Sequence, residues 1–243
     1  MPQIDARLIW FCVVLLGIDA FFIAMYSIHA IYFKFYNDRV PILGATWDIG
    51  KDRSYAEMFG YLKALLILSV LISIPQIWKR PIYLAFIAIY AFVLVDDAFQ
   101  LHEAGGLHFA EALGLQPFGG LRPRDAGELL VWTIAGIPLL AVTVFAVVRS
   151  PREDRRNGVL LMAALAVLVS FAVVADMAHV VLRGAFWGAN DVFEVIEDGG
   201  EQLTLSLTCG LAILIRRDVR GRQHQRLAPP EANSPLGCPT LGL

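Results

Sequence analysis

Six long apolar segments, separated by shorter polar stretches, make up most of this chain. They cover residues 8–33, 56–78, 82–103, 127–148, 158–182 and 192–215. An α-helix needs about 20 apolar residues to cross the hydrocarbon core of a bilayer, and a helix satisfies its own backbone hydrogen bonds there. The pattern therefore predicts an all-α fold, a polytopic membrane helix bundle with six transmembrane helices.

The stretches between and after these segments predict the remaining organisation. Residues 105–125 do not form a span, because Pro117, Gly119, Gly120 and Pro123 favour an irregular loop with at most a short interfacial helix. The chain after residue 216 is basic and then rich in Pro and Gly, which is typical of disorder. We therefore expect a transmembrane domain over residues 1–216 and a disordered cytoplasmic tail over residues 217–243.

The distribution of Lys and Arg predicts the orientation in the membrane. Dense basic clusters follow the second, fourth and sixth spans, whereas acids interrupt the basic residues that follow the first. Cytoplasmic loops carry the excess of Lys and Arg, so these three clusters and both termini are expected in the cytoplasm. We expect a multipass integral protein of a bacterial cytoplasmic membrane.

Composition narrows the class further. The chain is 57% hydrophobic and 17% charged, against roughly 45–50% and 25% in soluble domains, and its mean hydropathy is +0.61. A net charge of −2 without a basic face argues against a nucleic-acid partner. Cys12, Cys209 and Cys238 show no paired spacing, so no disulfide framework is implied. P-loop, GxSxG and HExxH motifs are missing from the sequence.

One acidic stretch stands out against this background. Glu194, Glu197, Asp198 and Glu201 fall within about one third of a helix circumference, at the start of the sixth apolar segment. A carboxylate near hydrocarbon costs roughly 2.5–3.5 kcal/mol on insertion scales, so these side chains should face partners inside the protein. The glycine pair at 199–200 would let a neighbouring segment approach closely.

Acids and histidines on two other spans are expected at the same level. Counting about 1.5 Å per residue places them in the outer third of the membrane. They are Asp96 and Glu103 on the third span, and Asp176 and His179 on the fifth. Helical spacing puts Asp96 and Glu103 on one face of the third span and turns Asp97 and His102 away from it.

Some polar residues have a simpler explanation. Three patterns fit a helix capping box, Ser54-x-x-Glu57, Asp125-x-x-Glu128 and Asp191-x-x-Glu194. Asp19 and Tyr26 are expected to form contacts between helices. The sequence leaves open whether His29, Asp97 and His102 join a site.

The remaining acids outnumber the nearby cations. Unpaired carboxylates in a low dielectric must take up protons or bind a cation, and mixed carboxylate–imidazole ligation suits Zn, Mn or Fe. We predict a divalent metal site, with Asp96 and Asp198 behind the ligands or as a catalytic base. The predicted ligands are Glu103, Asp176, His179, Glu197 and Glu201. A metal-free network of hydrogen bonds and ion pairs that uses Arg183 is the alternative.

Three functions are compatible with these features. The leading hypothesis is a membrane-embedded metalloenzyme that acts on a lipid or lipid-linked substrate entering from the bilayer. A proton- or cation-coupled transporter is the first alternative. A structural subunit of a larger complex that binds haem or pigment through His29, His102 or His179 is the second. Substrate, metal identity and oligomeric state remain open.

Overall fold

The computed structural model describes residues 5–36 and 45–227, which form helices and no β-strand. The α-helices are α1 (Ala6–Tyr36), α2 (Tyr55–Ile72), α3 (Pro81–Phe99), α4 (Leu101–Leu113), α5 (Pro123–Arg149), α6 (Arg152–Val169), α7 (Asp176–Leu182) and α8 (Ala189–Leu227). Two 3₁₀ turns, η1 (Ala45–Trp47) and η2 (Ile77–Lys79), and a π-helical segment, η3 (Ser170–Ala175), complete the order.

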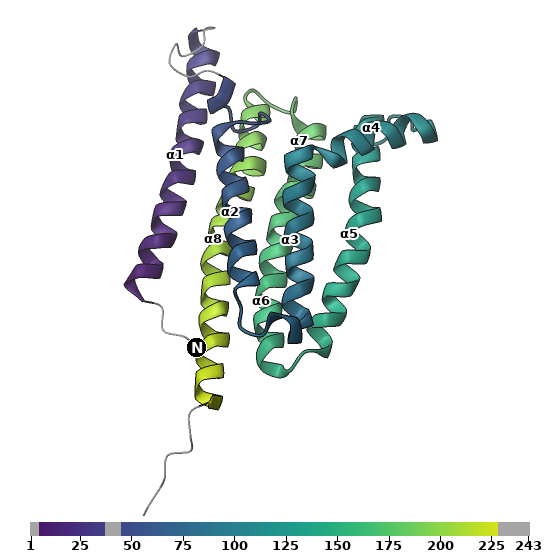
Figure 1. The fold of residues 1–243 in the computed structure, drawn as a ribbon. Helices are drawn as coiled ribbons and strands as arrows, with labels where there is room; N and C mark the ends of the chain where they lie inside the picture. Colours follow the sequence, from purple (N-terminus) through teal and green to yellow (C-terminus); the bar gives the residue numbers. More distant parts are fainter. Residues whose placement is uncertain (1–4, 37–44, 228–243) are drawn as a thin grey trace, which may run out of the picture.

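Five helices are long and apolar enough to cross a membrane. They are α1, α2, α3, α5 and the continuous helix α6–η3–α7 (Arg152–Leu182). The helix α8 corresponds to the sixth predicted span, and its acids and arginines set it apart from these five. It runs lengthwise through the bundle against α1, α2 and α6 (Figure 1). This architecture makes the chain a multipass integral membrane protein.

The centre of the bundle is built around α8. Cys209, Ala212 and Ile215 of α8 pack against Leu71 of α2 and Phe86 of α3, and all are buried. Apolar side chains also cover the outside of the bundle, where lipid is as apolar as the core. Helix association therefore relies on close van der Waals packing and interhelical hydrogen bonds rather than on the hydrophobic effect.

The chain turns sharply between α3 and α4. Gln100 adopts a left-handed conformation with φ of 53°, which ends α3, and α4 then crosses the end of the bundle to lie on α5 (Figure 1). Gly127 of α5 makes this packing possible, because a Cβ there would lie 2.0 Å from the carbonyl oxygen of Gly106. The helix α4 is longer than the one or two turns predicted for this region.

Polar contacts hold α1 on the bundle. Only 17% of the apolar stretch of this helix is buried inside the protein. From one end of α1 to the other they join Asp5 to Arg217, Asp19 to Lys63, Tyr26 to Glu194, and Lys34 to Asp191. The expectation that Asp19 and Tyr26 contact other helices is thus confirmed. Because these contacts run along the whole helix, the position of α1 depends on polar pairing as well as on packing against α8.

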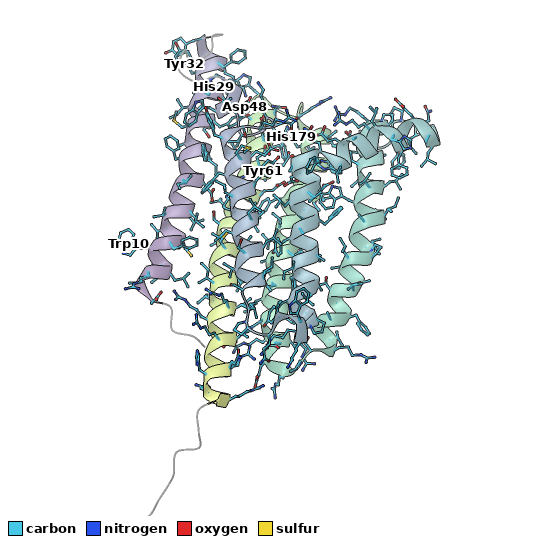
Figure 2. All side chains as sticks on the ribbon, in the orientation of Figure 1. Trp10, His29, Tyr32, Asp48, Tyr61 and His179 are labelled. Carbon is cyan, nitrogen blue, oxygen red and sulfur yellow. The ribbon has the colours of Figure 1, made fainter. Side chains whose placement is uncertain are left out.

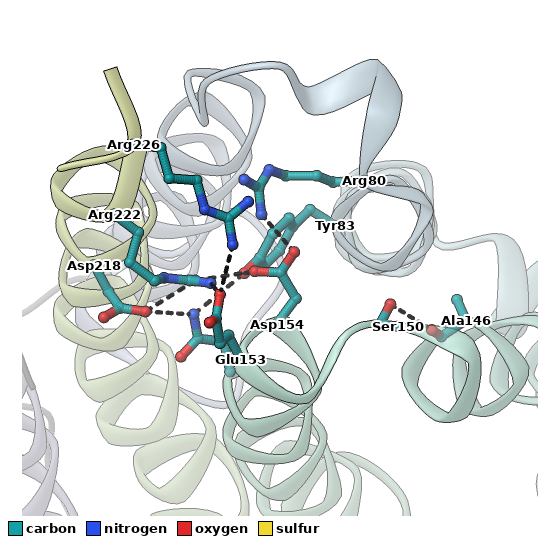
Figure 3. Close-up of polar contacts among 10 residues, drawn as sticks. Arg80, Tyr83, Ala146, Ser150, Glu153, Asp154, Asp218, Arg222 and Arg226 are labelled. Carbon is teal, nitrogen blue, oxygen red and sulfur yellow. Dashed lines mark hydrogen bonds and ion pairs between the residues drawn. The ribbon is translucent and has the colours of Figure 1, made fainter. Parts of the chain in front are cut away.

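Asp154 connects three helices at the opposite end of the bundle from α4. It accepts from Arg80 of α3 and from Arg222 of α8, the latter at 2.9 Å (Figure 3). The start of α1 and the end of α8 lie at this same end, as the 2.9 Å contact between Asp5 and Arg217 requires. The helix α8 continues to Leu227, so the first part of the segment expected to be disordered is helical. Residues 228–243 lie outside the described part of the chain.

The three predicted capping boxes have different outcomes. Ser54 caps α2, since its Oγ accepts from the backbone N–H of Glu57 at 3.2 Å. The box at the start of α5 begins three residues earlier than predicted. Arg122 is the N-cap residue, and Asp125, three residues later, accepts from the backbone N–H of Arg122 at 2.8 Å. The box of Asp191 and Glu194 does not form, because α8 begins at Ala189 and both residues lie inside the helix. The carboxylate of Glu194 instead accepts from Tyr26 on α1.

Candidate functional site: a carboxylate-lined cavity

A cavity of about 360 Å³ opens at the end of the bundle where α4 crosses. Side chains from α2, α3, α4, α5, α6, η3, α7 and α8 line it, and Figure 2 shows Tyr61 and His179 at this end. Its acids are Asp52, Glu57, Asp97, Glu103, Glu128, Asp176, Glu197, Asp198 and Glu201, and its cations are Lys51, Arg122 and Arg124. The lining is therefore strongly negative.

Four of these acids are partly buried and have no partner for their carboxylates within the described residues. The carboxylates of Asp97, Asp176, Asp198 and Glu201 accept no hydrogen bond and form no ion pair there, although each lies on the cavity wall. By contrast, Arg124 binds both Glu103 and Glu128. The uncompensated charge is thus concentrated on α3, α7 and α8, deeper than the arginines of α5.

Two local features bring the acids of α7 and α8 to the cavity. The π-helical segment η3 directly precedes Asp176, and such one-turn insertions change the direction in which the following side chains point. Gly200 of α8 faces this segment, because a Cβ there would lie 2.3 Å from the ring of Phe171. On a different side of α8, a Cβ on Gly199 would lie 3.1 Å from Ile23 of α1. The glycine pair does permit close packing, as predicted, but against side chains.

His102 joins the cavity wall, contrary to the predicted facing. The prediction treated residues 82–103 as one helix, but the left-handed Gln100 turns the chain so that His102 folds back over Asp96. The fully buried Asp96 accepts from the backbone N–H of His102 at 2.9 Å and lies 2.8 Å from its Nδ1. Asp97 also lines the cavity, while Asp96 lies behind the imidazole. An imidazole held in this way presents Nε2 as a base or metal ligand.

Asp96 also changes the titration of His102. Burial is the largest single influence and lowers the pKa of His102. The hydrogen bond and charge of Asp96, with the charges of Glu128 and Asp97, outweigh it, so this pKa lies above its ordinary value of 6.5. A raised histidine pKa stabilises the fold below the unfolded-state value, and this contribution disappears as the pH rises through the folded-state pKa.

We expect Asp96→Asn to lower the pKa of His102, because the charge that favours the imidazolium is lost. An NMR titration of the imidazole resonances in metal-free protein measures this shift. His108→Gln, which alters an exposed histidine of α4, serves as the control and identifies the signals. An unchanged His102 titration in Asp96→Asn would contradict the pairing.

The structure divides the predicted metal ligands. Asp176, Glu197 and Glu201 line the cavity together with Asp198. His179 lies beside them and is bound through Nδ1 to Glu197 at 2.7 Å and through Nε2 to Asn190 at 3.2 Å. Glu103 reaches the cavity but pairs with Arg124. Within residues 5–36 and 45–227, no three His, Cys, Asp or Glu side chains are placed to hold one metal ion.

A buried ion pair beneath the cavity was not predicted. Lys63 of α2 donates to Asp19 of α1 at 2.7 Å and to the backbone carbonyl of Gln202 at 2.7 Å. Ser206 donates to the other oxygen of Asp19, and the Lys63 ammonium lies 4.7 Å from the centre of the Phe59 ring. Lys63 and Asp19 are each 1% exposed. A lone lysine within an apolar span was the available signal, because such a residue needs an acidic partner.

The fold and this cavity define a multipass helical membrane protein with an acidic chamber at one end. The chain belongs to a family described as Domain of unknown function (DUF8692), whose model matches residues 8–215. The match includes every residue that lines the cavity. Neither the curated proteins nor the solved structures contain a match to the chain.

Proposed function

We propose that this protein binds a divalent metal ion in the carboxylate-lined cavity and that the metal centre acts on a lipid or lipid-linked substrate. The observation that carries the proposal is the set of four unpaired carboxylates, from three helices, on one cavity wall. Acids in a low-dielectric site have to be neutralised by protons or by a cation. A divalent ion neutralises two of them at once.

The proposed ligands differ in part from those predicted from the sequence. Asp176 and Glu201 remain, and so does Glu197, whose Oε2 alone contacts His179. Asp97 and the Nε2 of His102 replace Glu103, which pairs with Arg124, and His179, both of whose nitrogens have partners. Because no three of these groups converge as they lie, binding requires the carboxylates to rotate toward a common centre. Such a set of carboxylates and one imidazole suits Mn, Fe or Zn.

The cavity also has a wall suited to a lipid. Below the acids it is lined by Leu168 and Val169 of α6, Ala172 of η3 and Leu129 of α5. An acyl or isoprenoid chain fits against such a surface while a polar head reaches the acids. Asp198 would accept a proton from metal-bound water, while Asp96 would hold the imidazole of His102 in place as a ligand.

The metal content of protein purified in detergent tests this function. We expect wild type to carry close to one equivalent of metal and Glu197→Gln to lose most of it, because a ligand is removed without a change in size. Glu111→Gln on the exposed outer part of α4 is the matched control and should keep the metal. Wild type that holds no metal after incubation with Mn, Fe or Zn would contradict the proposal.

The enzymatic part of the proposal has a separate test. Metal-loaded protein incubated in vesicles of bacterial lipid extract is expected to convert a lipid species that mass spectrometry detects. The same experiment with Glu197→Gln should show no conversion. Bound metal without any conversion would restrict the function to metal binding.

The buried ion pair favours proton- or cation-coupled transport as a second candidate. Lys63 and Asp19 lie next to Gln202, which lines the cavity floor, and so extend the ionisable groups below the cavity. Proton-dependent flux into vesicles that is lost in Asp19→Asn would support transport. Flux that is absent in wild type would argue against it.

We further propose that α8 is a sixth transmembrane crossing and that the arginine-rich end faces the cytoplasm of a bacterium. The concentration of Lys and Arg at that end supports this orientation. In a cysteine-free background, an impermeant thiol reagent applied to spheroplasts should label Gly184→Cys and not Arg155→Cys. The reverse labelling would invert the topology.

A further inference from the structure

A second cavity lies at the arginine-rich end of the bundle, between α6 and α8. Its volume is about 830 Å³, more than twice that of the carboxylate-lined cavity. Arg152, Arg155 and Arg156 of α6 line it together with Val159 and Leu160 of the same helix. We call it the arginine groove.

Glu153 and Asp218 also line the groove, and both are paired with arginines of α8, as Figure 3 shows. Glu153 accepts from Arg222 at 3.0 Å and from Arg226 at 3.2 Å, and Asp218 lies 3.0 Å from Arg222. The arginines of α6 have fewer partners. Arg156 only approaches Asp218, at 3.9 Å, and Arg152 and Arg155 form no ion pair within the described residues. Positive charge is therefore available to a ligand.

Apolar side chains continue the groove toward the membrane. Residues 152, 155, 156 and 159 follow helical spacing, so they share one face of α6. Val159 and Leu160 are 55% and 44% exposed on this side, one turn or about 5 Å beyond Arg156 along the helix. From the end of the bundle inward, the groove thus offers three guanidinium groups and then an apolar surface.

We propose that the arginine groove binds an anionic phospholipid. Its phosphate diester would lie against Arg152, Arg155 and Arg156, and an acyl chain along Val159 and Leu160. Guanidinium groups bind phosphate oxygens through paired, charge-assisted hydrogen bonds. The charge order of the groove matches a phospholipid, whose anionic group lies at the membrane surface above its chains.

Native mass spectrometry with added lipid tests the site. The probes are dioleoylphosphatidylglycerol and dioleoylphosphatidylcholine, which share acyl chains and differ in net charge. We expect wild type to retain phosphatidylglycerol preferentially. The variant Arg152→Gln/Arg155→Gln/Arg156→Gln should bind it on the order of 100-fold more weakly, because each cation near an anionic lipid contributes about fivefold.

The matched control removes three arginines from the same end but outside the groove. Arg7→Gln/Arg149→Gln/Arg220→Gln lowers the net charge equally, and its residues are exposed on α1, α5 and α8. Retained binding in this control supports the groove. Equal loss in both variants would show that only overall charge matters and would overturn the proposal. So would displacement of the lipid by millimolar inorganic phosphate, which would identify a site for free phosphate.

Discussion

Replacing Lys63 with Met is expected to destabilise the protein by about 3–5 kcal/mol, the cost of leaving one partner of a buried ion pair uncompensated. Asp19 would keep only the hydrogen bond from Ser206 and would remain buried between α1, α2 and α8. Since polar contacts hold α1 on the bundle, we expect this helix to detach first. Unfolding by SDS in mixed micelles, followed by circular dichroism, measures the change.

Two further variants test whether the loss of stability comes from leaving Asp19 buried without its partner. The double variant Lys63→Met/Asp19→Leu should recover most of the lost stability, because buried ion pairs are often replaced by apolar residues at little cost. Lys51→Met breaks another Lys–Asp contact, 3.3 Å long, whose lysine side chain is 49% exposed, and should cost less than about 1 kcal/mol. A double variant as unstable as Lys63→Met would contradict this account of the ion pair.

The second large effect is the change in stability caused by Glu201→Gln, which we expect to reverse its sign when metal is added. In metal-free protein, Glu201→Gln should raise the stability by about 1–2 kcal/mol, since a neutral amide replaces a carboxylate that lies on the cavity wall without a partner. With metal at 100 times its dissociation constant, wild type gains about 2.7 kcal/mol and the variant gains much less. Wild type then becomes the more stable protein.

Unfolding in micelles with EDTA and with added Mn²⁺ measures this reversal. Glu111→Gln, which changes an exposed acid of the same type, should shift stability by less than about 0.5 kcal/mol in both conditions. If Glu201→Gln is destabilised equally with and without metal, the residue supports the fold and the proposed role is wrong.

The spans were predictable because hydropathy and length are properties of the local sequence. Five of the six apolar segments correspond to helices that are able to cross a membrane. The acidic stretch of α8 was also informative, because four acids on one helix face near hydrocarbon require a polar interior. Glu197, Asp198 and Glu201 do line one cavity.

The details of the site were less predictable because they depend on breaks in the helices. Gln100 adopts a left-handed conformation with φ of 53° without the Gly or Pro that usually marks such a turn. Extending the helix past it therefore assigned His102 to the wrong face. The π-helical segment η3 lies in an ordinary apolar sequence, Ser170–Ala175, so its effect on Asp176 was not visible. Lys63 is a charged residue inside an apolar segment, but its partner Asp19 lies on another helix, so the ion pair depends on how the helices pack.

Binding of Mn²⁺ to EDTA-treated protein, followed through the EPR signal of the free ion, tests the metal site most directly. We predict one saturable site in wild type, weakened at least tenfold in Glu201→Gln and unchanged in Glu111→Gln. A wild-type protein that shows no saturable Mn²⁺ binding, or the same binding in Glu201→Gln, would contradict the proposal that the carboxylate-lined cavity is a metal centre.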